Sequence, residues 1–203
     1  MTVLSKWDLR LDVDMVLRSQ GADPEAIRRR SPRLVESARR ALEEGSLLLQ
    51  PRVTTQRLLV EDLHHERVKL EGGGLLSGWL LVKHMAGAQE AIIVLCTVGD
   101  ALERRAAEVS KRDAVYGLAL DGLGSAGVEA LANAACALIK DEAAKEGYQV
   151  TMPLSPGMVG WPVECGQPQI FELLDASEIG VRLTKSMMMI PRKSLAFVLG
   201  IGK

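Results

Sequence analysis

The chain has 203 residues, 47% of them apolar and 25% charged, which is usual for a globular protein with a sizeable core. Its formal net charge of −1 argues against a nucleic-acid-binding protein, because neutralising phosphates requires a clear basic excess. The longest uninterrupted apolar run, Ala91 to Cys96, is too short to cross a bilayer, and no signal-like segment precedes Trp7. We therefore expect a cytoplasmic protein that binds neither nucleic acid nor membrane.

Three cysteines, Cys96, Cys136 and Cys165, lie far apart in the sequence. No C-x-x-C is present, and no Cys and His residues have zinc-site spacing. The pattern predicts no metal site and suits a reducing compartment.

The first fifty residues predict a strand and helices. Polar and apolar residues alternate from Lys6 to Val13, which indicates a strand leading into a helix that stops at Gly21. Asp23-Pro24 and Ser31-Pro32 are typical helix starts, since Asp and Ser can cap and Pro fits the first turn. Gly45 ends the last of these helices.

The next segments predict strands followed by a helix and a buried strand. Residues 52–61 and 66–71 are rich in Val, Leu and Thr and indicate a hairpin, followed by a glycine loop at 72–74. Residues 77–86 favour a short helix. The apolar segment 91–97 is typical of a buried strand.

The second half of the chain predicts mostly helix. A helix at 100–110 precedes one long helix at 113–146, which Gly147 ends. A helix at 167–175 and a last strand at 193–201 follow. Because strands and helices do not alternate strictly, we predict an α+β fold with a mainly antiparallel sheet and flanking helices. We expect one domain over residues 1–203, with residues 1–50 packed onto the rest.

The segment Gly122 to Gly127 matches the dinucleotide-binding pattern G-x-G-x-x-G. The pattern requires a preceding strand and an acidic residue at the end of a second strand, whereas Asp141 and Glu142 fall inside the helical pattern. Glycines inside a helix each cost about 1 kcal/mol, so they need a packing reason. We interpret them as positions where another element approaches the helix. A nucleotide-dependent oxidoreductase remains the weaker alternative.

Two further segments have a structural and a functional interpretation. Ser155-Pro156-Gly157 forms a turn in either case, because Pro fixes φ and Gly allows positive φ. It either connects two elements or presents backbone to a ligand. Residues 187–189 are three consecutive methionines, which either pack in the core as part of a strand or form an adaptable contact surface.

An ordered series near the end of the chain resembles a known family. It comprises Ser155-Pro156-Gly157-Met158, the apolar stretch Ile170 to Asp175, the segment Ile179 to Ser186, and the step Met189-Ile190-Pro191 before the last strand. The series resembles the C-terminal activation domain of cobalamin-dependent methionine synthase. It is also similar to stand-alone proteins related to that domain, with which it shares Gly124 to Ala130 and Pro191 to Ser194.

The resemblance implies a function and its components. The family domain binds S-adenosylmethionine (AdoMet) and holds it over the cobalt. Oxidised cob(II)alamin is thereby reductively remethylated, with an electron from a flavodoxin-like protein. For this chain the resemblance implies an accessory module of a cobalamin-dependent methionine synthase or methyltransferase system. AdoMet would be its cofactor, and a cobalamin-binding domain or a truncated methionine synthase would be its partner. A complete catalyst is not expected.

The resemblance also implies site residues. Ser155, Pro156, Gly157 and Met158 would contact AdoMet through their backbone, and Glu129 would meet its cationic end. From its residue type, and not from the resemblance, we expect Trp161 to be an anchor for the corrinoid partner, since aromatic residues often dominate interface energy.

This chain departs from the family motif Arg-x-x-x-Gly-Tyr. Pro153 stands where the arginine belongs and Met158 where the tyrosine belongs. The alternative function is therefore a non-catalytic docking protein that recognises a corrinoid domain without binding AdoMet.

Overall fold

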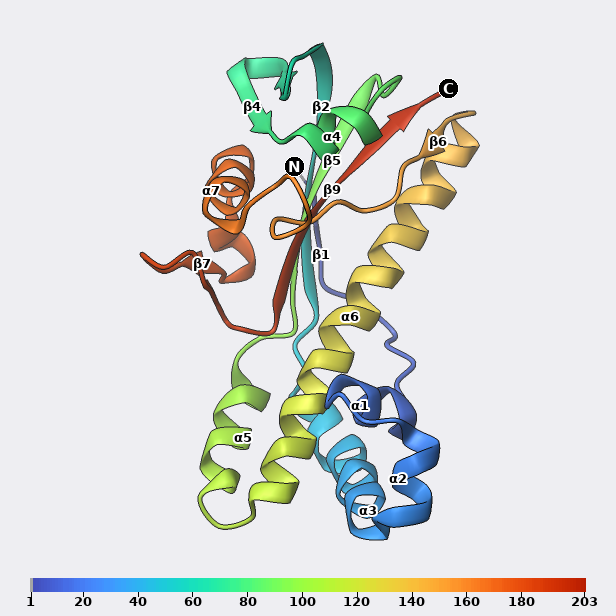
Figure 1. Cartoon of the computed structure of the whole chain (residues 1–203), viewed down its shortest axis with the longest axis vertical. Helices are drawn as coiled ribbons and strands as arrows, with labels where there is room; N and C mark the ends of the chain where they lie inside the picture. Colours follow the sequence, from blue (N-terminus) through green and yellow to red (C-terminus); the bar gives the residue numbers. More distant parts are fainter. Residues whose placement is uncertain (1) are drawn as a thin grey trace.

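The computed structural model describes residues 2–203 as an α+β fold, with a curled sheet at one end and a group of helices at the other (Figure 1). All strand pairs in residues 2–203 are antiparallel, which confirms the predicted fold class. The long helix α6 runs from the helical end up along the sheet (Figure 1). The strands are β1 (Thr2–Leu4), β2 (Arg52–His64), β3 (Arg67–Leu70), β4 (Gly74–Ser77), β5 (Glu90–Thr97), β6 (Gln149–Val150), β7 (Arg182–Leu183), β8 (Met189–Ile190) and β9 (Ser194–Gly202). The helices are α1 (Val13–Ser19), α2 (Pro24–Arg30), α3 (Pro32–Arg40), α4 (Trp79–His84), α5 (Ala101–Ser110), α6 (Ala114–Lys145) and α7 (Val163–Leu173).

The sheet has the order β4-β3-β2-β5-β9-β6, and β1 pairs with β2 beside β3. The long central strands β2, β5 and β9 form its middle, with Arg52 opposite Thr97 and Thr97 opposite Ser194. A separate ribbon joins β7 to β8. The short β6 covers only the end of β9, which leaves most of β9 at an edge of the sheet.

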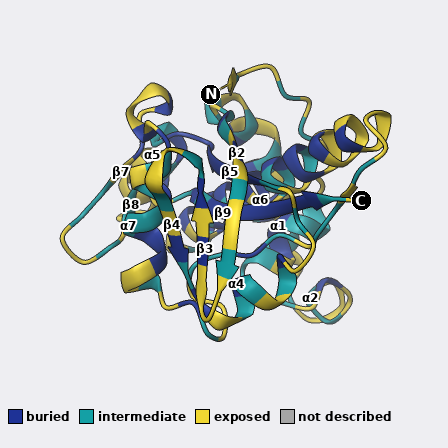
Figure 2. Cartoon of the chain, turned by 90° about the horizontal axis from the view of Figure 1, so that it is seen from above, coloured by how far each residue is buried: buried dark blue, intermediate teal, exposed yellow. Residues whose placement is uncertain are grey.

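The two faces of the sheet bury different cores. Leu95, Ala196 and Val198 face the side that α7 covers, together with Trp161 and Ile170. The alternate residues of the same strands face α6 on the other side. Figure 2 shows β9 buried between these two layers. The alternation follows from the period of two along a strand, since successive side chains point to opposite faces.

The helical end is built on the first half of α6, where α1, α3 and α5 pack against it. The prediction that residues 113–146 form one helix is confirmed: Asp113 caps α6 by accepting a hydrogen bond from the Tyr116 N–H. The packing explanation of its glycines is also confirmed. A Cβ at Gly122 would lie 2.7 Å from Gln20 Cγ, and one at Gly124 would lie 3.1 Å from Lys193 Cγ.

Helix α6 is the one element in residues 2–203 that is long and apolar enough to span a membrane. Its most apolar window is 56% buried inside the protein. Helices in the cores of soluble proteins meet the same criterion of length and hydropathy, so the finding is weak support for a membrane span.

Three element predictions were wrong. The alternation from Lys6 to Val13 is not a strand: Trp7 and Leu9 pack against the α6 side of the sheet, and the following apolar residues pack against the helical end. Within residues 2–203, the only strand before α1 is β1. The predicted glycine loop at 72–74 is one residue too long: Gly72 and Gly73 lie in the turn after β3, whereas Gly74 is the first residue of β4, a strand that was not predicted.

The third wrong prediction concerns α7. The helix begins at Val163 and contains Pro168, whereas the sequence predicted a start near Gln167. Proline is most common in the first turn of a helix, whereas Pro168 lies in the interior of α7. The helix ends at Leu173, before the predicted end at Asp175, and a 3₁₀ turn follows at Ala176–Ile179.

Candidate functional site

The edge of β9 that no strand covers is the axis of the candidate site. Val198 exchanges two backbone hydrogen bonds with Leu154, at 2.8 and 2.9 Å, so its backbone points away from β5. Because backbone direction alternates along an antiparallel strand, the N–H and C=O of Ala196 point to the same edge. Neither group has a hydrogen-bond partner within residues 2–203. This stretch can therefore bind a ligand through its backbone.

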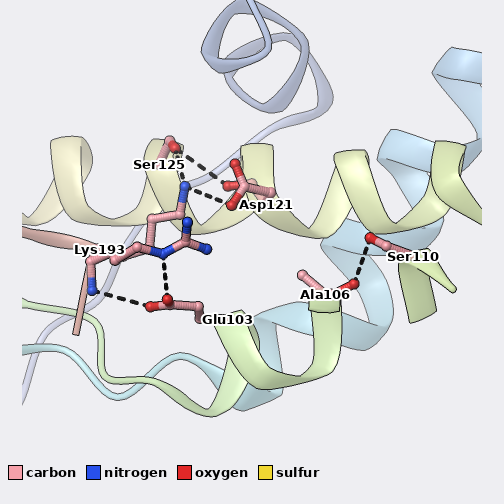
Figure 3. A network of polar contacts seen from close by, with 7 residues as sticks. Glu103, Ala106, Ser110, Asp121, Ser125 and Lys193 are labelled. Atoms are coloured by element: carbon pink, nitrogen blue, oxygen red, sulfur yellow. Dashed lines mark hydrogen bonds and ion pairs between the residues drawn. The ribbon is translucent and has the colours of Figure 1, made fainter. Parts of the chain in front are cut away.

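One end of this edge is a polar corner formed by Arg192, Lys193 and Ser194. Lys193 Nζ donates to Ser125 Oγ at 2.8 Å and lies 2.9 Å from Asp121 Oδ1 (Figure 3). The Arg192 backbone N–H donates to Glu103 Oε2 at 3.1 Å, and its guanidinium pairs with the same carboxylate. The hydrogen bond between the guanidinium and Glu103 raises the pKa of Arg192. The corner thus fixes the start of β9 to α5 and α6.

Ser194 completes the corner from the sheet. Its Oγ lies 2.9 Å from Thr97 Oγ1 and 2.7 Å from the carbonyl oxygen of Pro191, and both hydroxyl side chains are buried. Sequence reasoning singled out Pro191 to Ser194 only as part of a resemblance. The partners Asp121 and Glu103 lie on helices far away in the sequence, and no local pattern predicts those contacts.

The other end of the edge is the loop between β6 and α7, which crosses the sheet from the α6 side to the α7 side (Figure 1). Gly157 has φ of 99°, a conformation that favours glycine, and its N–H donates to the Trp161 carbonyl at 2.8 Å. The Met158 N–H donates to the Ser155 carbonyl at 3.1 Å. The predicted turn at Ser155 to Met158 is therefore present and closed by backbone hydrogen bonds.

The surface of this loop is apolar. Met152, Met158 and Val159 are exposed by 50%, 36% and 76%, respectively. We refer to residues 152–160 as the apolar loop. It contrasts with the polar corner because most of its hydrogen bonds join backbone groups rather than side chains.

Trp161 is buried, with an exposure of 1%, and does not offer a surface anchor as predicted. Its indole N–H donates to Gln169 Oε1 at 3.2 Å, and its ring packs so closely on Gly166 that a Cβ there would lie 2.7 Å from the indole nitrogen. Partner contact by Trp161 was inferred from residue type alone. Here the ring fills the core beneath the apolar loop.

Glu129 lies on α6 and is exposed. It lines a hollow of about 370 Å³ between α1 and α6, together with Met15, Arg18, Ser19, Ala126 and Asn133. Sequence reasoning missed Arg18, because α1 and this part of α6 are more than a hundred residues apart. No residue of the apolar loop lines the hollow.

The predicted AdoMet residues thus lie in two places rather than in one enclosed pocket. Leu154 attaches the apolar loop to β9 at Val198, and Ser125, one turn before Glu129, binds Lys193 at the start of the same strand. The unpaired edge of β9 at Ala196 lies between these two contacts in the sequence.

The methionine segment follows neither interpretation completely. Met187 has φ of 60° in the turn between β7 and β8, so it is not part of a strand. Met188 is exposed by 55%, whereas Met189 packs against the core on the α7 side. One methionine is therefore a core residue and its neighbour is available for contact.

Within residues 2–203, no group of three or more His, Cys, Asp or Glu side chains is arranged to hold a metal ion. His64 and His65 lie at the hairpin end of β2 and line an open cavity of about 770 Å³. Cys96 is buried, and desolvation raises the pKa of its thiol to about 12, so this thiol is not a nucleophile at neutral pH.

Comparison with known proteins gives a match by structure alone. No family model matches the chain, and no curated protein sequence matches it. A crystal structure of the MetH reactivation domain bound to S-adenosylhomocysteine (AdoHcy) matches it with a TM-score of 0.71. The match covers 98% of this chain and 78% of that chain, at 15% sequence identity. At this identity the likeness concerns the fold: the chain resembles the MetH reactivation domain in its architecture.

Proposed function

We propose that this protein is an accessory module of a cobalamin-dependent methionine synthase or methyltransferase system that supports reductive reactivation of the corrinoid. The observation that carries the proposal is the fold match to a reactivation domain bound to AdoHcy, which extends over nearly the whole chain. The motif series from Ser155 to Pro191 supports it from the sequence.

The residues present are suited to an AdoMet-type ligand. The Ala196 backbone offers one donor and one acceptor at the edge of β9, a pair that can bind a heterocycle such as adenine. The carboxylate of Glu129 forms no ion pair within residues 2–203 and can meet a cationic group. AdoMet, when bound, would supply the methyl group. The protein's own residues bind and orient it.

The corrinoid would be carried by a partner, either a cobalamin-binding domain or a truncated methionine synthase, and a flavodoxin-like protein would supply the electron. The apolar loop is suited to the contact with the corrinoid partner, since Met152, Met158 and Val159 are exposed next to the end of the β9 edge. Methionine adapts to partners of different shape, which suits a transient contact.

The second candidate function is docking to a corrinoid domain without AdoMet. Pro153 and Met158 favour it, because they replace the arginine and tyrosine of the family motif. The missing arginine removes a charge-assisted contact of a kind that contributes roughly 1.5–3 kcal/mol. We therefore expect AdoMet affinity on the order of ten- to a hundredfold below that of a domain that keeps the arginine.

Calorimetric titration of AdoMet into the wild type, Glu129→Gln and Pro153→Arg tests the proposal. Glu129→Gln keeps the shape and removes the negative charge, so we expect weaker binding by roughly tenfold. Pro153→Arg should strengthen binding by restoring the charged donor. Glu142→Gln on the same helix is a matched control, because Glu142 is also exposed and lies outside the hollow.

The outcomes separate the two functions. If the wild type binds AdoMet and Glu129→Gln binds it with the same affinity, the assigned site is refuted. No binding by any variant, Pro153→Arg included, would favour the docking protein. In that case, a spectral change in a cob(II)alamin-loaded methionine synthase fragment on addition of this protein would still support corrinoid recognition.

A further inference from the structure

The hollow between α1 and α6 combines groups of opposite charge. Arg18 comes from the last turn of α1, and Glu129 comes from the middle of α6. Ser19 and Asn133 add a hydroxyl and an amide, and Met15 and Ala126 are its apolar lining. The hollow measures about 370 Å³, which is enough for a small polar group rather than a whole protein segment.

Both charges lack a partner within the protein. Ten ion pairs connect residues 2–203, and neither Arg18 nor Glu129 takes part in any of them. Neighbouring charges are used differently: Asp14 of α1 pairs with Arg28, and Asp121 of α6 pairs with Lys193. The hollow thus presents a guanidinium and a carboxylate that do not neutralise each other.

A zwitterion complements this arrangement. The guanidinium of arginine matches a carboxylate through two parallel hydrogen bonds, and a carboxylate accepts hydrogen bonds from an ammonium group. Serine hydroxyl and asparagine amide groups satisfy the remaining donors and acceptors. An α-amino-acid group, with its carboxylate and ammonium on one carbon, has the required pair of charges.

We propose that this hollow binds the amino-acid end of the AdoMet-type ligand, with Arg18 holding its carboxylate and Glu129 its ammonium group. The proposal rests on the proposed function and names a residue outside the family motif. Arg18 would supply from α1 the charge that Pro153 cannot supply from the loop. The rest of the ligand would extend toward β9, since Ser125, adjacent to Ala126, binds Lys193 at the start of that strand.

The test compares two ligands on three proteins. AdoHcy has the amino-acid end, whereas 5′-methylthioadenosine keeps the nucleoside and lacks that end. We expect Arg18→Gln to lower the affinity for AdoHcy by roughly ten- to a hundredfold, the effect of losing one charge-assisted contact. Binding of 5′-methylthioadenosine, measured by displacement up to millimolar concentration, should stay within about twofold of the wild type. Arg18→Lys keeps the charge and should recover part of the AdoHcy affinity.

Arg33→Gln is the matched control, because Arg33 is an exposed arginine on α3 outside the hollow. This substitution should leave the affinity for both ligands unchanged. If Arg18→Gln lowered the affinity for both ligands equally, Arg18 would have a merely structural role, and the proposal would be overturned. Unchanged AdoHcy binding would also overturn it, while leaving the proposed function intact. A wild type that binds neither ligand would overturn both this proposal and the AdoMet part of the proposed function.

Discussion

The two ends of the β9 edge are built in opposite ways. At the polar corner, Lys193 contacts Ser125 and Asp121 of α6 while Arg192 binds Glu103 of α5, so side chains of two helices fix the start of the strand (Figure 3). At the apolar loop, most hydrogen bonds join backbone groups, two of them to Val198 of β9, and Met152 and Val159 are exposed.

The difference indicates a division of roles. A fixed corner keeps the edge of β9 and the neighbouring hollow in constant geometry, as ligand binding requires. An apolar surface with soft side chains can adjust to a protein partner. We infer that ligand affinity depends mainly on the corner and the hollow, and partner affinity on the loop.

The largest expected effect is the loss of Trp161, because the apolar loop rests on its ring. Trp161→Ala should lower the free energy of unfolding by about 3–5 kcal/mol, as expected for removing a buried aromatic side chain. Urea denaturation followed by circular dichroism measures it. Val159→Ser is the control: this side chain is 76% exposed, so the change should stay within about 0.5 kcal/mol. Equal effects of both substitutions would contradict the distinction between the exposed loop and its buried support.

A smaller effect is expected at the polar corner. Lys193→Met should cost about 1–2 kcal/mol, since its side chain is 15% exposed but Asp121 is 44% exposed and stays solvated. Combining it with Asp121→Asn in a double-mutant cycle isolates the ion pair, for which we expect a coupling of about 0.5–1 kcal/mol. A coupling of zero would show that the pair does not fix the corner, and Ser125 would then be the principal contact of Lys193.

Much of the fold could be predicted from local patterns. The apolar spacing predicted that α6 continues across Gly122, Gly124 and Gly127, as it does. The segments at 52–61 and 91–97 were predicted as strands and are central strands of the sheet. The prediction failed between Lys6 and Val13, where alternation reflects packing of Trp7 and Leu9 without a partner strand. Alternation of polar and apolar residues indicates which side chains are buried, but it does not by itself show that the segment pairs with another strand.

The candidate site was predictable only in part. The Ser155 to Met158 turn follows from Pro and Gly chemistry, and the structure contains it. Burial of Trp161 depends on Gly166 and Gln169, and the position of Arg18 depends on how α1 docks onto α6. These are tertiary contacts, which single-sequence patterns do not encode.

The central claim is that the edge of β9 binds an AdoMet-type ligand between the polar corner and the apolar loop. Amide hydrogen exchange followed by NMR, with and without saturating AdoHcy, tests it most directly. Without ligand, the Ala196 amide should exchange much faster than those of Leu195 and Phe197, which face β5. With AdoHcy, the Ala196 amide should become protected. AdoHcy binding that leaves the Ala196 amide as fast as before would contradict the account.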